Sequence, residues 1–98
     1  MTDSPVRVIL PGMLRDLVGV LAEIEVPSPE SGQTVGDLLD QAFVDHRILD
    51  SKVRDERGLI RLHVKVFVNG EDATRGEGVG APVPAGARVH IINAVSGG

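Results

Sequence analysis

Ninety-eight residues, of which 42% are hydrophobic and 24% charged, predict a single soluble globular domain over residues 1–98. The chain has no cysteine, which excludes disulfides, cysteine metal sites and thiol catalysis. Its net charge of −4, without a basic run, argues against nucleic acid and favours basic protein partners. No apolar run could span a bilayer, and Met1–Pro5 lacks the features of a secretory signal, so we expect no membrane association and a cytoplasmic protein.

Two short strands are expected at the start of the chain. Val6–Leu10 is a β-branched run closed by a Pro-Gly pair, and residues 21–26 alternate between apolar and polar up to Pro27. The stretch between them, Met13–Gly19, has room for about one turn of helix, but we favour a wide loop whose leucines cover the edge of the core.

The clearest helix begins after Thr34. This residue is a candidate N-cap, with Asp37 three residues further on, and apolar residues follow at the spacing of one helical face. The apolar stripe consists of Val35, Leu38, Leu39, Ala42 and Phe43. The polar residues Asp37, Asp40, Gln41 and Asp45 fall on the solvated side, where we expect the acidic ones to serve solubility.

Charge dominates the next stretch, residues 46–58. Its only apolar anchors are Ile48, Leu49 and Val53. We therefore expect a surface segment with room for a turn of helix.

The second half of the chain predicts two long strands. His63–Val68 alternates strictly and is closed by Asn69-Gly70, a strong signal for a two-residue hairpin turn. Glu71–Gly86 is rich in glycine and proline and predicts loop or short edge structure before a final strand at Arg88–Asn93. The whole order predicts an α+β fold in which one main helix packs on one face of a mixed sheet of four to five strands.

The chain ends in Gly97-Gly98, which is a chemical handle. Glycine has no Cβ, so a tail of this kind can thread a narrow channel and present its α-carboxylate to another protein's active site. An ionised carboxylate is unreactive until an ATP-using partner converts it to an acyl-adenylate. A frayed or trimmed terminus is the alternative interpretation.

Two other patterns carry little weight. Gly76–Ala81 looks like a nucleotide-binding glycine loop, but prolines follow where such a loop needs a helix, so we interpret it as a turn. His46, His63 and His90 are far apart and lack the paired spacing of metal ligands, so no metal is expected.

Several motifs together resemble the MoaD/ThiS family of ubiquitin-like sulfur carriers over nearly the whole chain. They are Leu-Arg-x-Leu at residues 14–17, Thr-Val-x-Asp-Leu-Leu at 34–39, Val-Asn-Gly at 68–70 and the Gly-Gly end. Within the family, residues 65–72 and 94–98 look most like the actinobacterial carriers of the CysO type. Asn93 is a departure, because these carriers usually have a proline shortly before the tail.

The resemblance implies a β-grasp fold with a flexible tail at about residues 94–98, and a carrier that is not itself an enzyme. An E1-like adenylyltransferase would use ATP to adenylate Gly98, and a sulfurtransferase would replace the AMP with sulfur to give a thiocarboxylate. The carrier itself would bind no cofactor. Val95, Ser96 and Gly97 would thread the partner's channel. The sulfur would pass to a cysteine-synthase-like enzyme or, next in preference, to the large subunit of molybdopterin synthase. The alternative is a ubiquitin-like protein modifier or a purely structural module.

Strand parity suggests where such partners dock. If Val8, Val66 and Ile91 face the helix, then Ile9, Phe67 and Ile92 lie on the opposite face of the sheet. We expect this trio to form a partner-docking patch. Cover by loops, or ordinary exposed apolar residues, is the alternative.

Overall fold

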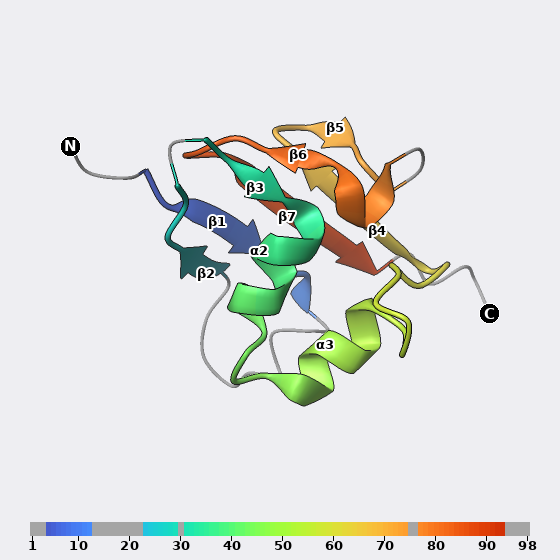
Figure 1. Ribbon diagram of the computed structural model, residues 1–98. Helices are drawn as coiled ribbons and strands as arrows, with labels where there is room; N and C mark the ends of the chain where they lie inside the picture. Colours follow the sequence, from blue (N-terminus) through green and yellow to red (C-terminus); the bar gives the residue numbers. More distant parts are fainter. Residues whose placement is uncertain (1–3, 13–22, 30, 75–76, 94–98) are drawn as a thin grey trace.

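At the centre of the fold, strand β1 (Val6–Ile9) pairs in parallel with the last strand, β7 (Arg88–Asn93). The computed structural model describes residues 4–12, 23–29, 31–74 and 77–93. Strand β2 (Glu23–Val26) lies antiparallel to β1 on one side, and β4 (Val64–Val68) lies antiparallel to β7 on the other. With β5 (Glu71–Asp72) at the edge, the five strands have the order β2-β1-β7-β4-β5 (Figure 1).

The β4–β5 hairpin depends on its Asn-Gly turn. Asn69 has φ of 50° and Gly70 has φ of 86°, the pair of positive values that a two-residue turn of this hand requires. Asn69 also ties the hairpin to β7, because its N–H donates to the carbonyl of Arg88 and its Oδ1 accepts from the N–H of Arg88. The predicted hairpin is confirmed.

Helix α2 (Val35–Ala42) begins as expected. The Thr34 hydroxyl oxygen accepts a hydrogen bond from the N–H of Asp37 at 3.1 Å and so satisfies one of the free donors of the first turn. All five residues of the predicted apolar stripe are buried, and the four polar residues are exposed. Just before the helix, β3 (Gln33–Thr34) pairs with β6 (Pro82–Val83) in a small second sheet that the sequence did not reveal.

Residues 46–58 contain more structure than a surface segment. Helix α3 (Arg47–Val53) forms there, and Leu49 and Val53 are almost completely buried in the core. Ile48, which was expected to anchor the segment, is 66% exposed instead. The spacing of four between the two buried residues is the helical signal, and two turns are too short for it to stand out among the charges.

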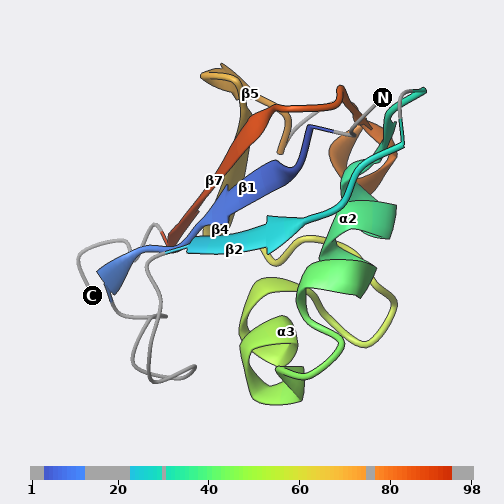
Figure 2. The same cartoon turned by 90° about the vertical axis from the view of Figure 1, so that its left-hand side faces the viewer.

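Both helices lie on the same side of the five-stranded sheet (Figure 2). The residues that the sheet turns toward them, including Val8, Val66, Val89 and Ile91, are at most 2% exposed. The predicted strand parity is therefore correct. Among the described residues, no helix has both the length and the apolar character needed to cross a membrane. The Met13–Gly19 connection and the tail at 94–98 lie outside the described residues.

The buried position of α3 leads to a prediction about stability. Leu49→Ala should lower the free energy of unfolding by about 2–5 kcal/mol, because it removes a core side chain and leaves a cavity. Ile48→Ala, one residue earlier on the exposed side of the same helix, should change it by less than about 0.5 kcal/mol. Urea unfolding of the two variants measures both values. If both variants lowered the free energy of unfolding by the same small amount, the core position of Leu49 would be wrong.

Candidate functional site

The candidate site is the outer face of the sheet, which we define as the face opposite α2 and α3. Cross-strand pairing sets out its central row, since Ile9 on β1 lies beside His90 on β7, and His90 lies beside Phe67 on β4. Neighbouring strands are about 4.8 Å apart, so the three side chains are adjacent. His90 thus stands between two of the three predicted docking residues, and all three side chains of the row are half-buried.

Ile92, the third residue of the trio, lies two positions further along β7 and is 43% exposed. It pairs with Lys65 on β4, which makes it a diagonal neighbour of Phe67, within reach for large side chains. The structure therefore brings Ile9, Phe67 and Ile92 onto one continuous surface around His90.

The charges on this face are segregated. On the three central strands the outward charged residues are Arg7, Lys65 and Arg88, and Arg7 on β1 lies opposite Arg88 in the register with β7. Among the described residues of this face, the carboxylates lie on the outer strands, with Glu23 and Glu25 on β2 and Asp72 on β5. Arg7 Nη1 lies 4.0 Å from Glu23 Oε1 and forms an ion pair with it. The face is therefore basic beside its apolar centre and acidic at its edges.

Sequence reasoning missed these basic residues and His90 as part of the surface. The signal was present, because Arg7, Lys65, Arg88 and His90 share the period-two parity of the apolar trio.

The site ends at the start of the tail. Asn93, the last described residue, pairs with Val64 on β4. The predicted tail residues Val95, Ser96, Gly97 and Gly98 lie outside the described residues.

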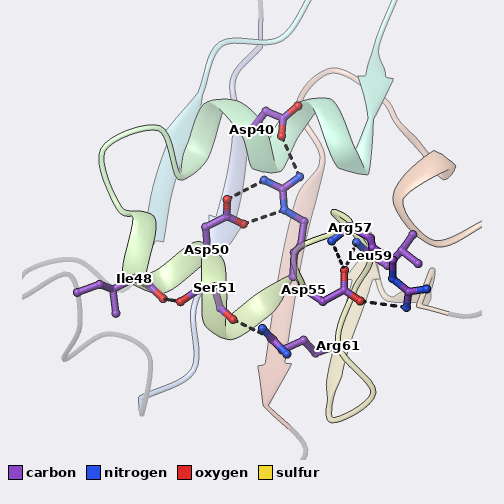
Figure 3. Close-up of polar contacts among 9 residues, drawn as sticks. Asp40, Ile48, Asp50, Ser51, Asp55, Arg57, Leu59 and Arg61 are labelled. Carbon is purple, nitrogen blue, oxygen red and sulfur yellow. Dashed lines mark hydrogen bonds and ion pairs between the residues drawn. The ribbon is translucent and has the colours of Figure 1, made fainter.

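A polar cluster joins the two helices on the other side of the molecule (Figure 3). Arg54, whose side chain is 10% exposed, donates from Nε to Asp50 Oδ1 at 2.8 Å and from Nη1 to Asp40 Oδ1 at 2.9 Å. The hydrogen bond to Asp50 is the main cause that raises the pKa of Arg54. Asp40 was expected on the solvated side, where it lies, and it also links α2 to the end of α3.

The turn after α3 is built around Asp55. Its Oδ1 accepts from the backbone N–H of Arg57 at 2.8 Å and from that of Leu59 at 3.0 Å (Figure 3). The bond from Leu59 is the main cause that lowers the pKa of Asp55 below its usual 3.8. Gly58, with φ of 83°, completes the turn in a conformation that favours glycine.

The described part of the glycine-rich segment 76–81 is a turn, as the sequence predicted. Gly78–Gly80 is a short 3₁₀ helix that leads into β6, and a Cβ at Gly36 on α2 would meet the carbonyl oxygen of Val79 at 3.2 Å. It therefore packs against a helix and is not followed by one. Within the described ranges, His, Asp and Glu side chains nowhere gather in a set of three that could hold a metal ion.

A mixed sheet with its main helix on one face, and a C-terminal strand in the centre, defines the ubiquitin-like β-grasp class. The chain belongs to the ThiS family, whose model matches residues 8–98. This family includes ubiquitin-like sulfur carriers and modifiers, so the predicted family and the predicted fold are confirmed.

Three relatives illustrate the similarity. Small archaeal modifier protein 1 of Haloferax volcanii is 38% identical over 65 residues, which cover 66% of this chain and 70% of that protein. Its crystal structure superposes with a TM-score of 0.79 at 29% identity, over 97% of this chain and all of that one. A chain of the Amycolatopsis orientalis BexX/CysO complex superposes with a TM-score of 0.78 at 28% identity, over 95% of this chain and 99% of that one. Mycobacterium tuberculosis CysO gives 0.76 at 25% identity, over 92% and 99%.

The Asp55 turn predicts a pH dependence. A carboxylate whose pKa is lowered by folding stabilises the folded state above its unfolded pKa, and this contribution is lost as the pH falls through the folded value. Asp55→Asn keeps an accepting oxygen but removes the charge. The variant should unfold at a lower temperature than the wild type at neutral pH, and the gap should narrow as the pH falls below the usual pKa of 3.8 and through the lowered pKa of the folded state. Thermal unfolding across this range measures the gap, and a constant gap would contradict the assignment.

Proposed function

We propose that the protein is a sulfur carrier, with the carboxylate of Gly98 as the atom group that carries sulfur. The observation that supports this most is the extent of the family match, which runs from the first strand through the terminal diglycine. A fold match alone would leave the tail without a role, whereas a match through the last residue includes it.

The proposed chemistry takes place in partner enzymes. A carboxylate oxygen of Gly98 attacks the α-phosphorus of ATP in an E1-like enzyme, pyrophosphate leaves, and an acyl-adenylate forms. A hydrosulfide sulfur from the donor then attacks the acyl carbon and AMP leaves, so that a thiocarboxylate remains. ATP is a substrate of the activating enzyme, and the carrier binds no cofactor. Val95, Ser96 and Gly97 serve as the narrow arm that reaches the reacting centre.

The outer face of the sheet is proposed to dock the partner. Its apolar trio of Ile9, Phe67 and Ile92 gives an area that loses water on binding, and Arg7, Lys65 and Arg88 favour acidic residues opposite them. The carrier then contributes position rather than catalysis. It is not an enzyme in this proposal, and it acts in the cytoplasm.

Cysteine biosynthesis is the favoured destination of the sulfur, with molybdopterin synthesis next. Two of the similar solved structures contain CysO, and residues 65–72 and 94–98 gave the same preference from sequence. The sulfur-accepting partner would then be a cysteine-synthase-like enzyme.

A second function, protein modification, is favoured by a different observation. The curated relative at 38% identity is a small archaeal modifier protein. In that case the activated Gly98 would join lysine side chains of other proteins. Enrichment of the tagged chain from cells, followed by a search for tryptic peptides whose lysine carries residues 89–98, the remnant that cleavage after Arg88 leaves, separates the two functions.

The first functional prediction concerns Gly98. With ATP, the E1-like enzyme of the same genome and a sulfur donor, intact-protein mass spectrometry should show one oxygen exchanged for sulfur at the C-terminus. Deletion of Gly98 should abolish the exchange and leave the melting temperature unchanged, because a terminal residue after the last strand adds nothing to the described core. Failure of the wild-type chain with every candidate activating enzyme would refute the carrier proposal.

The second functional prediction concerns Phe67. Phe67→Ala should weaken binding to the activating or accepting enzyme by about 2 kcal/mol or more, as loss of an aromatic anchor does. The free energy of unfolding should fall by less than about 3 kcal/mol, because the side chain is half-buried. Val66→Ala is the matched control on the buried side, and it should lower stability without a change in affinity. Calorimetric titration and thermal unfolding of both variants decide the matter. If Phe67→Ala lowered stability but not affinity, and Val66→Ala lowered affinity, the docking surface would not be on this face.

A further inference from the structure

A rigid turn next to the end of β7 holds two leucines in solvent. Leu59 is 44% exposed, and Leu62 is 104% exposed, more than any other large apolar residue among those described. Arg57, Arg61, His63 and Lys52 surround them. We call Leu59, Leu62 and these four residues the leucine turn.

Local chemistry does not account for Leu62. The N–H of Val64 donates to the carbonyl of Arg61 at 3.0 Å, so Leu62 and His63 are the two central residues of a β-turn. Such positions favour glycine, proline, asparagine, aspartate or serine, which have local reasons to be there. A leucine at the tip of a turn neither supports the turn nor reaches the core. A residue that breaks a local rule without a structural gain is expected at a functional site.

The backbone fixes these leucines in place. The N–H of Asp55 donates to the carbonyl of Leu59 at 2.8 Å, and the Asp55 carboxylate accepts from the N–H of Leu59. The N–H of Arg61 donates to the carbonyl of Val53 at 3.0 Å, which ties the turn to the end of α3. Ile60, between them, packs against the core. These bonds hold the backbone on the N-terminal side of Leu62 in a defined conformation, so both exposed leucines extend from an ordered segment toward a partner.

Shape and charge describe that partner. A surface hollow of about 490 Å³ lies between Leu59 and Leu62, and its wall also contains Asp55, Arg57, Ile60, Arg61 and His63. Lys52 shares a second hollow with Arg61 and His63, which extends the basic rim onto α3. Arg57 Nη2 lies 3.4 Å from Asp55 Oδ2 and forms an ion pair with it, so Arg61 and Lys52 remain as two positive charges against the single carboxylate of Glu56. An apolar side chain flanked by carboxylates fits this surface.

The position of the leucine turn connects it with the tail. Leu62 and His63 immediately precede Val64, and Val64 is the strand partner of Asn93, after which the tail begins (Figure 1). A protein that takes Gly98 into its active site must therefore cover the end of β7, where the first residues of β4 and the turn before them lie.

We propose that the leucine turn is a second docking surface, which inserts Leu62 into an acid-rimmed apolar recess of the enzyme that adenylates Gly98. This inference rests on the proposed function and adds a recognition site at the turn before β4 to the outer face of the sheet. A second copy of this chain fits less well, because a symmetric contact would bring the basic rims together.

The decisive test is Leu62→Ser in the full chain, with Ile48→Ser as the matched control. Both leave a small polar residue at an exposed apolar position, and Ile48 lies at the far end of α3 from Arg57 and Arg61 (Figure 3). Calorimetric titration against the activating enzyme should show affinity about tenfold or more lower for Leu62→Ser, and unchanged for Ile48→Ser. Both variants should have the same melting temperature as the wild type, because neither side chain is buried.

The variants Lys52→Ala and Arg47→Ala test whether the positive charge of the leucine turn attracts acidic residues around the enzyme's recess. Both remove one positive charge from the exposed surface of α3, but Lys52 belongs to the leucine turn and Arg47 does not. Lys52→Ala should slow association with the enzyme, and more so at low salt than at high salt, whereas Arg47→Ala should not.

The outcomes separate the two proposals. If the wild-type chain gains sulfur and Leu62→Ser binds the enzyme as tightly, the leucine turn is not a docking surface and the carrier function stands. If the wild-type chain is never activated, the carrier function fails and the leucine turn proposal fails with it. A wild-type dimer that Leu62→Ser converts to a monomer would assign the surface to a second copy and overturn the proposal.

Discussion

The parallel pairing of β1 with β7 is the contact on which the rest of the structure depends. Parallel neighbours need a long crossover, and here the crossover carries both helices and β4. The helices cover one face, so the period of two fixes the role of every residue in the central strands. A slip of one residue would expose Val8, Val89 and Val66 and bury Arg7 and Lys65, which explains why the register is strongly specified.

The same pairing sets the place where the chain can be functional. With β7 in the centre of the sheet, its outward residues lie between β1 and β4, and its end lies beside Val64 at the start of β4. Ile9, Ile92 and the leucine turn therefore lie toward the end of the sheet from which the tail continues. The leucine turn and the centre of the outer face are apolar with basic neighbours, while Arg54 engages Asp40 and Asp50 of the helical side within the fold. The acidic total of the chain hides this division.

Patterns carried by many neighbouring residues were predicted well. The α2 stripe, the His63–Val68 alternation and the Asn69-Gly70 turn each combine several consistent local preferences, and all are present in the structure. Short elements were not. Helix α3 has only two buried residues among charges, and β3 and β6 have two residues each, so their formation depends on tertiary pairing rather than on local preference. Ile48 and Leu49 show the limit, since adjacent apolar residues went to opposite environments.

The amino-acid sequence by itself determined the strand parity, the main helix, the diglycine handle and the family resemblance, because each is written in the order of residues along one element. Tertiary structure alone decided which elements lie side by side. It placed His90 between Ile9 and Phe67, joined Asp40 to Arg54 across 14 positions of sequence, and set Leu62 beside the end of β7. Contacts between distant segments depend on how strands are ordered in the sheet, and no local periodicity records that order.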